Sequence, residues 1–264
     1  MKVAFRVIGR FDRSAVSARW VRRQHHVDPQ VQRKIDETWQ QAIARQGIQL
    51  FDGPMCRLER YAVGEKLELE LSRTSYKIFW GTNLNNPSLA DQFGSDVMAN
   101  PVGLSCALES SDGYLMLGRR NKSVAYYPGK IHPFAGALEP AETVDVFAEV
   151  QRELNEELDL QPAELSSMFC IGIIEDLSLR QPELIFHANC VHPRRQIEKM
   201  LDPGEHEGVV AIKLPPAQFI SALSKSDLTP VALGTAMLWG RSLFGNAWFD
   251  AANAAVNLGG HESQ

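Results

Sequence analysis

The stretch RELNEELDL, residues 152 to 160, places Glu153, Glu156 and Glu157 at helical spacings of three and four. Like charges at such spacings repel each other by about 0.2–0.5 kcal/mol per pair in an isolated helix. They also lie in the C-terminal half of the helix, where the macrodipole is already negative. Arg152 directly precedes them and offsets only part of this repulsion. The stretch therefore indicates either a solvated acidic face or a site for a cation.

A helix over residues 144 to 158 carries this stretch. Its apolar side chains fall on one stripe that can pack against a core, and they are Val146, Phe147, Val150, Leu154 and Leu158. The glutamates lie beside the stripe on a rigid element. Mg²⁺ is usually held by one or two carboxylates, with substrate phosphates and water completing its shell. A magnesium site is therefore the functional alternative to a solvated face.

The loop before the helix, HPFAGALEPAE at residues 132 to 142, favours the magnesium site. Together the two stretches resemble the Nudix box: Gly, five residues, Glu, seven residues, then Arg-Glu-apolar-x-Glu-Glu-x-Gly-apolar. The matching positions are Gly136, Glu142, Arg152, Glu153, Leu154, Glu156, Glu157 and Leu160. The chain departs from the pattern in a spacer of nine residues after Glu142, in Asp159 at the glycine position, and in Ala135 before Gly136.

This resemblance implies an α/β fold, the Nudix α/β/α sandwich with a mixed sheet, and a loop-helix-loop metal site. Nudix enzymes hydrolyse a nucleoside diphosphate linked to another group. By residue matching, Glu153, Glu156 and Glu157 would bind Mg²⁺, with Mn²⁺ as a substitute, and Arg152 would orient them. A bound cation neutralises a diphosphate and lowers the pKa of water, which makes hydroxide available near neutral pH.

Further motifs outside the box resemble the animal Nudix proteins that hydrolyse UDP-glucose and UDP-galactose. They are LFDGPMCRLERY at 50–61, RTSYKIFWGTN at 73–83, NPVGLSCAL at 100–108, GRRNKSVAYYPG at 118–129 and GEHEG at 204–208. The implied reaction converts a UDP-sugar and water to UMP and a sugar 1-phosphate. We expect a smaller N-terminal α+β segment over 1–99 that contributes to the pocket, a Nudix domain over 100–258 and a tail over 259–264.

Four residues of the N-terminal segment are candidates for binding the nucleoside. Thr74, Ser75 and Asn83 can form hydrogen bonds to uracil or ribose, and the ring of Tyr76 can stack on a base. The alternative is structural: the aromatic residues form the core of a small domain, and Thr74-Ser75 caps a helix.

The Nudix part supplies candidates for phosphate binding and for water activation. Arg119, one of two adjacent arginines, can bind phosphate in a bidentate manner. His132 and Gly136 in the loop are expected near the substrate, although a lone histidine is more often structural. Glu207 is the candidate base, since a base must reach the attacking water. The rivals of Glu207 are Glu175 and Asp176.

Other elements follow from local patterns. Residues 28–46 form a helix that opens on Asp28 and Pro29, with Val31, Ile35, Trp39 and Ile43 on its packed face. Strand hairpins are expected over 102–120 and 167–191, and around the turn at Gly64-Glu65. Residues 123–135 favour a strand broken at Pro128-Gly129. Helices at 215–224 and 230–256 are expected to follow.

The composition limits the classes of partner. The chain has 264 residues, of which 44% are hydrophobic, and its formal net charge is -5. It lacks the basic patch of a nucleic-acid protein and any apolar run long enough for a membrane. Four scattered cysteines favour a cytoplasmic protein with reduced thiols. The expected partner is a nucleotide sugar, and the chain can be a monomer or a homodimer.

Two alternatives to a UDP-sugar diphosphatase stay open. The first is a Nudix enzyme for another nucleoside diphosphate derivative, such as ADP-ribose. The second is a non-catalytic protein that binds a nucleotide sugar and regulates a partner. Three repelling carboxylates, which a pure binding protein has little reason to keep, argue against the second.

Overall fold

We describe a computed structural model of the chain, covering residues 2–22, 27–45, 50–223 and 227–259. A large mixed sheet runs through the molecule in the order β1-β9-β10-β5-β6-β11, and β8 and β7 pair with β5 and β6. Its strands are β1 (Val3–Phe11), β5 (Gly103–Glu109), β6 (Leu115–Arg120), β7 (Ile131–His132), β8 (Phe134–Ala137), β9 (Leu165–Asp176), β10 (Gln181–Cys190) and β11 (His206–Ile212). Among the described residues, β5 and β10 form its one parallel pair, and the other strand pairs are antiparallel.

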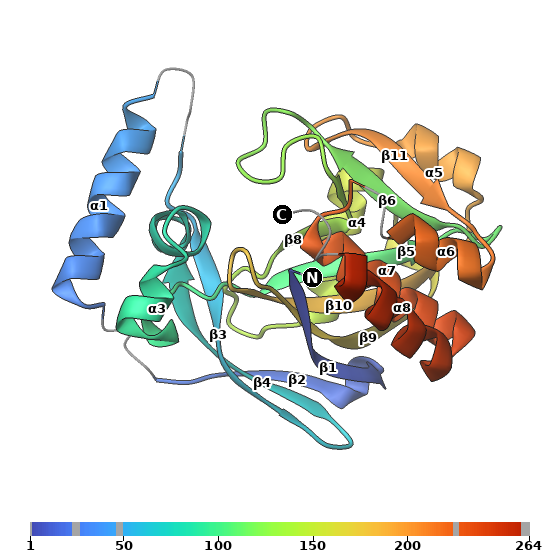
Figure 1. The fold of residues 1–264 in the computed structure, drawn as a ribbon, viewed down its shortest axis with the longest axis horizontal. Coiled ribbons are helices and arrows are strands. Elements are labelled where there is room, and N and C mark those ends of the chain that lie inside the picture. Colours follow the sequence, from blue (N-terminus) through green and yellow to red (C-terminus); the bar gives the residue numbers. More distant parts are fainter. Residues whose placement is uncertain (1, 23–26, 46–49, 224–226, 260–264) are drawn as a thin grey trace.

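Helices cover both faces of this sheet (Figure 1). The helix α4 (Val146–Leu158) packs its apolar stripe against Leu104, Cys106 and Phe186. On the other face, three helices pack against a second core that includes Ile174 and Ile185. They are α6 (Pro216–Leu223), α7 (Pro230–Phe244) and α8 (Asn246–Gly259). The short helix α5 (Arg194–Met200) precedes β11. The expected α/β/α sandwich is therefore confirmed.

A smaller sheet, β2-β4-β3, lies beside the large one and forms the N-terminal unit with α1 (Pro29–Ile43). Its strands are β2 (Val16–Trp20), β3 (Pro54–Val63) and β4 (Leu67–Ser75). Short helices follow: α2 (Tyr76–Phe79), a π-helical turn over Trp80–Leu84, and α3 (Leu89–Phe93). The first strand does not belong to the unit that we expected over 1–99, because β1 pairs with β9 in the large sheet.

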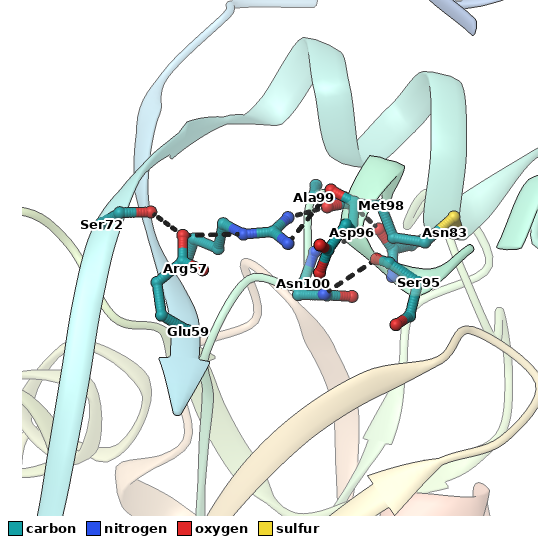
Figure 2. A network of polar contacts seen from close by, with 9 residues as sticks. All are labelled: Arg57, Glu59, Ser72, Asn83, Ser95, Asp96, Met98, Ala99 and Asn100. Carbon is teal, nitrogen blue, oxygen red and sulfur yellow. Dashed lines mark hydrogen bonds and ion pairs between the residues drawn. The ribbon is translucent and has the colours of Figure 1, made fainter. Parts of the chain in front are cut away.

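Arg57 joins β3 to the segment that leads into the large sheet, as Figure 2 shows. Its side chain is almost completely buried. Its Nε donates to Glu59 Oε1 at 3.1 Å, and its guanidinium also donates to the backbone carbonyls of Asp96 and Met98. Ser72 Oγ donates to the same Glu59 oxygen at 2.5 Å. The buried charge is thus satisfied by the fold of the N-terminal unit, and we assign it a structural role.

Most elements that the local patterns predict are confirmed, and three details are wrong. Residues 121–130 form turns, so the strand expected over 123–135 begins only at β7. The helix expected over 230–256 is broken at Gly245, whose φ of 85° lies in the left-handed region. On α1, Ala42 is buried, whereas Ile43 is 48% exposed. The tail after Gly259 lies outside the described residues. No described helix combines the length and apolar character that crossing a bilayer requires.

Candidate active site

The helix α4 begins and ends at residues suited to those positions. Asp145 caps its N-terminus, where Oδ1 accepts hydrogen bonds from the backbone N–H groups of Phe147 and Ala148 at 3.0 and 3.1 Å. Asp159 ends it in the left-handed conformation, with φ 51°. Glycine adopts this conformation most easily, which explains the glycine of the Nudix box at this position.

Arg152 lies at the centre of the acidic cluster. Its Nε and Nη2 donate to Glu149 Oε1 at 3.0 and 2.6 Å, and its Nη1 donates to Glu156 Oε2 at 2.6 Å. Nη2 also donates to Glu153. One guanidinium therefore orients three carboxylates and offsets part of their repulsion, in line with the role that the resemblance implies.

Glu153 is held against the strand β8. Its carboxyl group lies over Gly136, where a β-carbon would stand 2.1 Å from the Glu153 carboxyl carbon. Burial raises the pKa of Glu153 to about 7, and the charge of Arg152 opposes this rise. Glycine at position 136 is therefore required by the close approach of the acidic side chain.

Glu157 takes a different place from the other two glutamates. It is 8% exposed, and its Oε1 lies 3.4 Å from Nδ1 of His206 at the start of β11. Burial lowers the pKa of His206 to about 4, so its ring is neutral near pH 7. His206 in turn lies over Gly118, which leaves room for the ring. Glu157 thus faces the sheet beneath the helix and does not line the cavity described next.

A cavity of about 500 Å³ opens beside Glu153 and Glu156. Both units of the fold line it. The N-terminal unit contributes Met55, Tyr76 and Phe79, and the large sheet with its loops contributes Arg120, Val124, Ala125, Tyr126, His132, Gly136, Ala137, Glu139, Gln181, Glu183 and Glu205. Arg152 completes the side formed by α4. Six of the residues expected from sequence therefore meet here: Tyr76, His132, Gly136, Arg152, Glu153 and Glu156.

The other expected residues do not line this cavity. Asn83 is buried and donates through Nδ2 to the carbonyls of Leu179 and Arg180 at 2.9 and 3.0 Å, which is a structural contact. Thr74 is buried and Ser75 half-buried in β4. Ser75 does occupy the N-cap position of α2, but its side chain forms no capping hydrogen bond, and Asp52 Oδ1 accepts from the Lys77 N–H instead.

The predicted phosphate ligand and base also lie elsewhere. Arg119 donates to the carbonyl of Gly129 at 2.9 Å, outside the cavity, and Glu207 is exposed. Of the rival bases, Glu175 pairs with Arg6 at 2.5 Å beside a second cavity. Asp176 accepts from the hydroxyl of Tyr127 at 2.7 Å. The alternation of side chains along β6 explains why Arg120, and not Arg119, faces the cavity.

Arg120 is the buried cation of this cavity. It is 5% exposed, its guanidinium carbon lies 4.6 Å from the centre of the Tyr126 ring, and its Nη1 lies 4.0 Å from Glu205 Oε2. Its Nε is buried and has no hydrogen-bond partner among the described residues. Because a buried charge is costly unless it is paired and hydrogen-bonded, Arg120 is suited to an anionic ligand.

His132 and Glu183 form the floor near Arg120. Nδ1 of His132 lies 2.9 Å from the hydroxyl of Thr229, which caps α7, and burial lowers the pKa of His132 well below its usual value. Glu183 is 6% exposed and accepts a hydrogen bond from Ser105 Oγ at 3.1 Å. Burial likewise raises the pKa of Glu183 to about 8, so both groups are buried hydrogen-bonding groups whose charged forms are disfavoured.

The carboxylates of the cavity fit a magnesium ion whose coordination shell is completed by oxygens of the substrate. Among the described residues, no three metal-binding side chains already converge on one point. Glu153 and Glu156 nevertheless line the same cavity, and Mg²⁺ commonly takes one or two protein carboxylates together with phosphate oxygens. The same ion would also relieve the repulsion between these two acids.

The chain is similar in sequence to known proteins. No family model matches the chain. The human uridine diphosphate glucose pyrophosphatase NUDT22 is 27% identical, over 73% of this chain and 76% of the human protein. Nudix hydrolase 9 of Arabidopsis thaliana is 25% identical, over 67% and 69% of the two chains. The NUDIX domain of Shewanella oneidensis NrtR, solved with ADP ribose, has a TM-score of 0.42 and 14% identity, over 60% and 98%. The sequence relatives named uridine diphosphate glucose pyrophosphatase confirm the resemblance to the animal UDP-sugar group.

Proposed function

We propose that this chain, a Nudix hydrolase by its resemblance and its fold, hydrolyses the diphosphate of UDP-sugars to UMP and a sugar 1-phosphate. The observation that carries the proposal is that opposite charges from two elements line one cavity. Glu153 and Glu156 come from α4, and the buried Arg120 comes from β6. A diphosphate can bridge these two sides because it offers oxygens both to a cation and to a guanidinium.

Each residue then has a role that follows from its place. Glu153 and Glu156 would hold Mg²⁺, which supplies charge neutralisation and a bound water of lowered pKa. Arg152 fixes the two carboxylates through the hydrogen bonds described above. Arg120 binds the diphosphate and stabilises the charge that develops on the phosphoryl oxygens. Glu157 supports the helix from below, and we propose that it positions the helix and does not bind the metal.

The water-activating role that we expected for Glu207 fits Glu205 better. Glu205 lines the cavity and stands beside Arg120, whereas Glu207 points to solvent. A general base must lie within hydrogen-bond reach of the water that it deprotonates. Tyr76 and Phe79 line the cavity from the N-terminal unit.

The name of a similar protein supports the choice of substrate. The human relative is named as a UDP-glucose pyrophosphatase, and the similarity spans most of both chains. A cavity of about 500 Å³ is also large enough for a small-molecule ligand. The motifs of the N-terminal unit that carry the subgroup resemblance build one wall of this cavity through Met55 and Tyr76.

The test is sugar-nucleotide turnover, measured as phosphate released by a coupled phosphatase. The panel contains UDP-glucose, UDP-galactose, ADP-ribose and a GDP-sugar, each in millimolar Mg²⁺ and again with EDTA. We expect UDP-sugars to be turned over fastest and EDTA to abolish turnover. Glu153→Gln should lose most activity, and Glu68→Gln, at an exposed site on β4, should keep it. Faster turnover of another nucleotide would show that the UDP-sugars are not the preferred substrates. Binding of a nucleotide sugar without turnover would favour a regulatory protein.

A further inference from the structure

The loop of residues 121–130, between β6 and β7, carries two adjacent tyrosines that have different surroundings. Tyr126 lines the cavity, whereas Tyr127 lines a separate hollow and its hydroxyl donates to Asp176 Oδ2 at 2.7 Å. The backbone of Tyr127 has φ 51°, in the left-handed region that a bulky L-residue rarely adopts. Such a conformation persists where surrounding contacts hold it, often at a functional site. The contacts that hold Tyr127 are therefore expected to serve the site that the loop borders.

Asp176, at the end of β9, is a fixed acceptor for this hydrogen bond. It is 1% exposed, and its other oxygen, Oδ1, accepts from the backbone N–H groups of Ser178 and Leu179 at 2.8 and 3.3 Å. The carbonyl of Leu179 in turn accepts from Asn83 Nδ2, so the N-terminal unit holds the same turn. Because the turn is held by its own hydrogen bonds and by the N-terminal unit, the Tyr127 hydroxyl attaches the loop to a fixed point.

The middle of the loop depends on this hydrogen bond. The ends of the loop are held close to β6: Asn121 Nδ2 donates to the carbonyl of Gly204 at 2.8 Å, and the N–H of Gly129 donates to the carbonyl of Arg120 at 3.1 Å. Half of the ten residues are exposed, so packing alone gives the middle little support. The Tyr127 hydroxyl joins this middle part to β9, a strand that is not a neighbour of β6 or β7 in the sheet. Loss of the hydroxyl should therefore free the middle of the loop while its ends stay in place.

The other tyrosine, Tyr126, supports the cation of the cavity. The guanidinium carbon of Arg120 lies 4.6 Å from the centre of the Tyr126 ring, a distance typical of a cation–π contact. This ring also meets those of Phe79 and His132 edge to face, with centres 6.4 Å away in both cases. Arg120 Nε has no hydrogen-bond partner among the described residues, and Glu205 Oε2 lies 4.0 Å from Nη1. The direction of the guanidinium therefore depends to a large extent on the Tyr126 ring.

We propose that Tyr127 is a positioning residue for diphosphate binding and acts through Tyr126 on Arg120. Its hydrogen bond to Asp176 fixes the loop, and the fixed loop keeps the Tyr126 ring on the guanidinium. The left-handed backbone turns the chain between the two tyrosines, so that one side chain reaches β9 while the other reaches the cavity. This inference rests on the proposed function, since it takes Arg120 as the residue that binds the diphosphate.

The test is the affinity of the full chain for UDP and for ADP, measured by calorimetry in EDTA, where turnover plays no part. Tyr127→Phe removes only the hydroxyl and should weaken the binding of both nucleotides about 3- to 10-fold, the effect of one lost hydrogen bond. Tyr61→Phe, at an exposed site on β3, is the matched control and should change either affinity less than about twofold.

A double-mutant cycle with Arg120→Met separates positioning from a general effect on the fold. Arg120→Met removes the cation through which Tyr127 acts, so adding Tyr127→Phe should then weaken binding less than about twofold. The inference is overturned by wild-type affinity in Tyr127→Phe, by an equal loss in both backgrounds, or by a wild type that binds neither nucleotide. Thermal unfolding checks the fold of each variant. Asp176→Ala, which removes the acceptor, gives the same cycle if Tyr127→Phe does not fold.

The two proposals can fail separately. Coupling between Tyr127 and Arg120 without turnover of UDP-sugars would keep the positioning role and reject only the proposed function. Turnover of UDP-sugars without this coupling would do the reverse.

Discussion

The Cα of Gly136 lies against the carboxyl group of Glu153, so that a β-carbon at position 136 would stand 2.1 Å from the carboxyl carbon. Gly136→Ala should therefore push Glu153 out of place while leaving its chemistry unchanged. A misplacement of about 1 Å in an active site can cost about 10²-fold in rate, and we expect a loss of this order in kcat/KM for UDP-glucose. Gly64→Ala, at a turn where no atom lies within 4 Å, is the control. Unchanged kinetics of Gly136→Ala would contradict this role of Glu153.

The adjacent arginines of β6 offer a matched pair. Arg120 is buried in the cavity, whereas Arg119 donates only to a backbone carbonyl outside it. Arg120→Lys should lower kcat/KM about 10- to 100-fold, because lysine lacks the planar fork that binds phosphate in a bidentate manner. Arg119→Lys should change kcat/KM less than about threefold, since rim charges contribute little. Steady-state kinetics of both variants measure these losses. A larger loss of kcat/KM in Arg119→Lys than in Arg120→Lys would instead support Arg119 as the phosphate ligand, as the sequence predicts.

The left-handed end of α4 predicts a stabilising substitution. Asp159 has φ 51°, a conformation that costs an L-residue roughly 1–2 kcal/mol. Glycine avoids this cost, but its greater conformational freedom in the unfolded chain offsets part of the resulting gain in stability. Asp159→Gly should therefore raise the free energy of unfolding by about 0.5–1 kcal/mol. Ala148→Gly, in the same helix, should lower it by about 1 kcal/mol. Urea unfolding measures both, and a less stable Asp159→Gly would show that the aspartate has a compensating contact.

Glu183 predicts how stability depends on pH. Its pKa is about 8 in the fold and 4.5 as the ordinary value. Between these values the unfolded chain releases a proton that the fold retains, so the contribution of Glu183 is complete below pH 4.5 and decreases as pH rises toward 8. Glu183→Gln removes this dependence.

The difference in melting temperature between Glu183→Gln and the wild type should therefore increase from about pH 5 to about pH 8, the range over which Glu183 loses its proton. Thermal unfolding at several pH values measures this difference. Glu68→Gln, which replaces an exposed carboxylate, should show a constant difference from the wild type. A constant difference for Glu183→Gln as well would mean that the carboxyl group is ionised in the fold.

Local periodicity was sufficient for the helix α4, its core stripe and most strands. The stripe from Val146 to Leu158 is a property of the helical repeat, and all five of its apolar residues are buried. The box pattern placed Arg152, Glu153 and Gly136 together because their contacts lie within one loop and one helix. Interactions of this short range are encoded in neighbouring residues.

The far side of the cavity depends on long-range pairing, which the sequence pattern does not contain. Arg120 and Arg119 point to opposite faces because they are neighbours on β6, and the pairing of β6 with β11 in the folded sheet decides which face meets the cavity. Glu183 reaches the cavity only because β10 pairs with β5, a strand that lies far away in the sequence. Asn83 looked like a ligand for the nucleoside because it is polar, but its partners, the carbonyls of Leu179 and Arg180, are distant in the chain.

The pairing of β1 with β9 has a consequence for how the cavity is assembled. The large sheet includes residues 3–11 and resumes at residue 103, so the smaller unit is an insertion within a single domain, attached to it at both ends. Tyr76 and Phe79 are therefore held at a high effective concentration relative to the large sheet. Bringing them against the cavity costs little conformational entropy of the chain. A truncation that begins near residue 100 would remove an edge strand together with this wall, so the remaining chain would lose both the pairing of β1 with β9 and the part of the cavity formed by Met55, Tyr76 and Phe79.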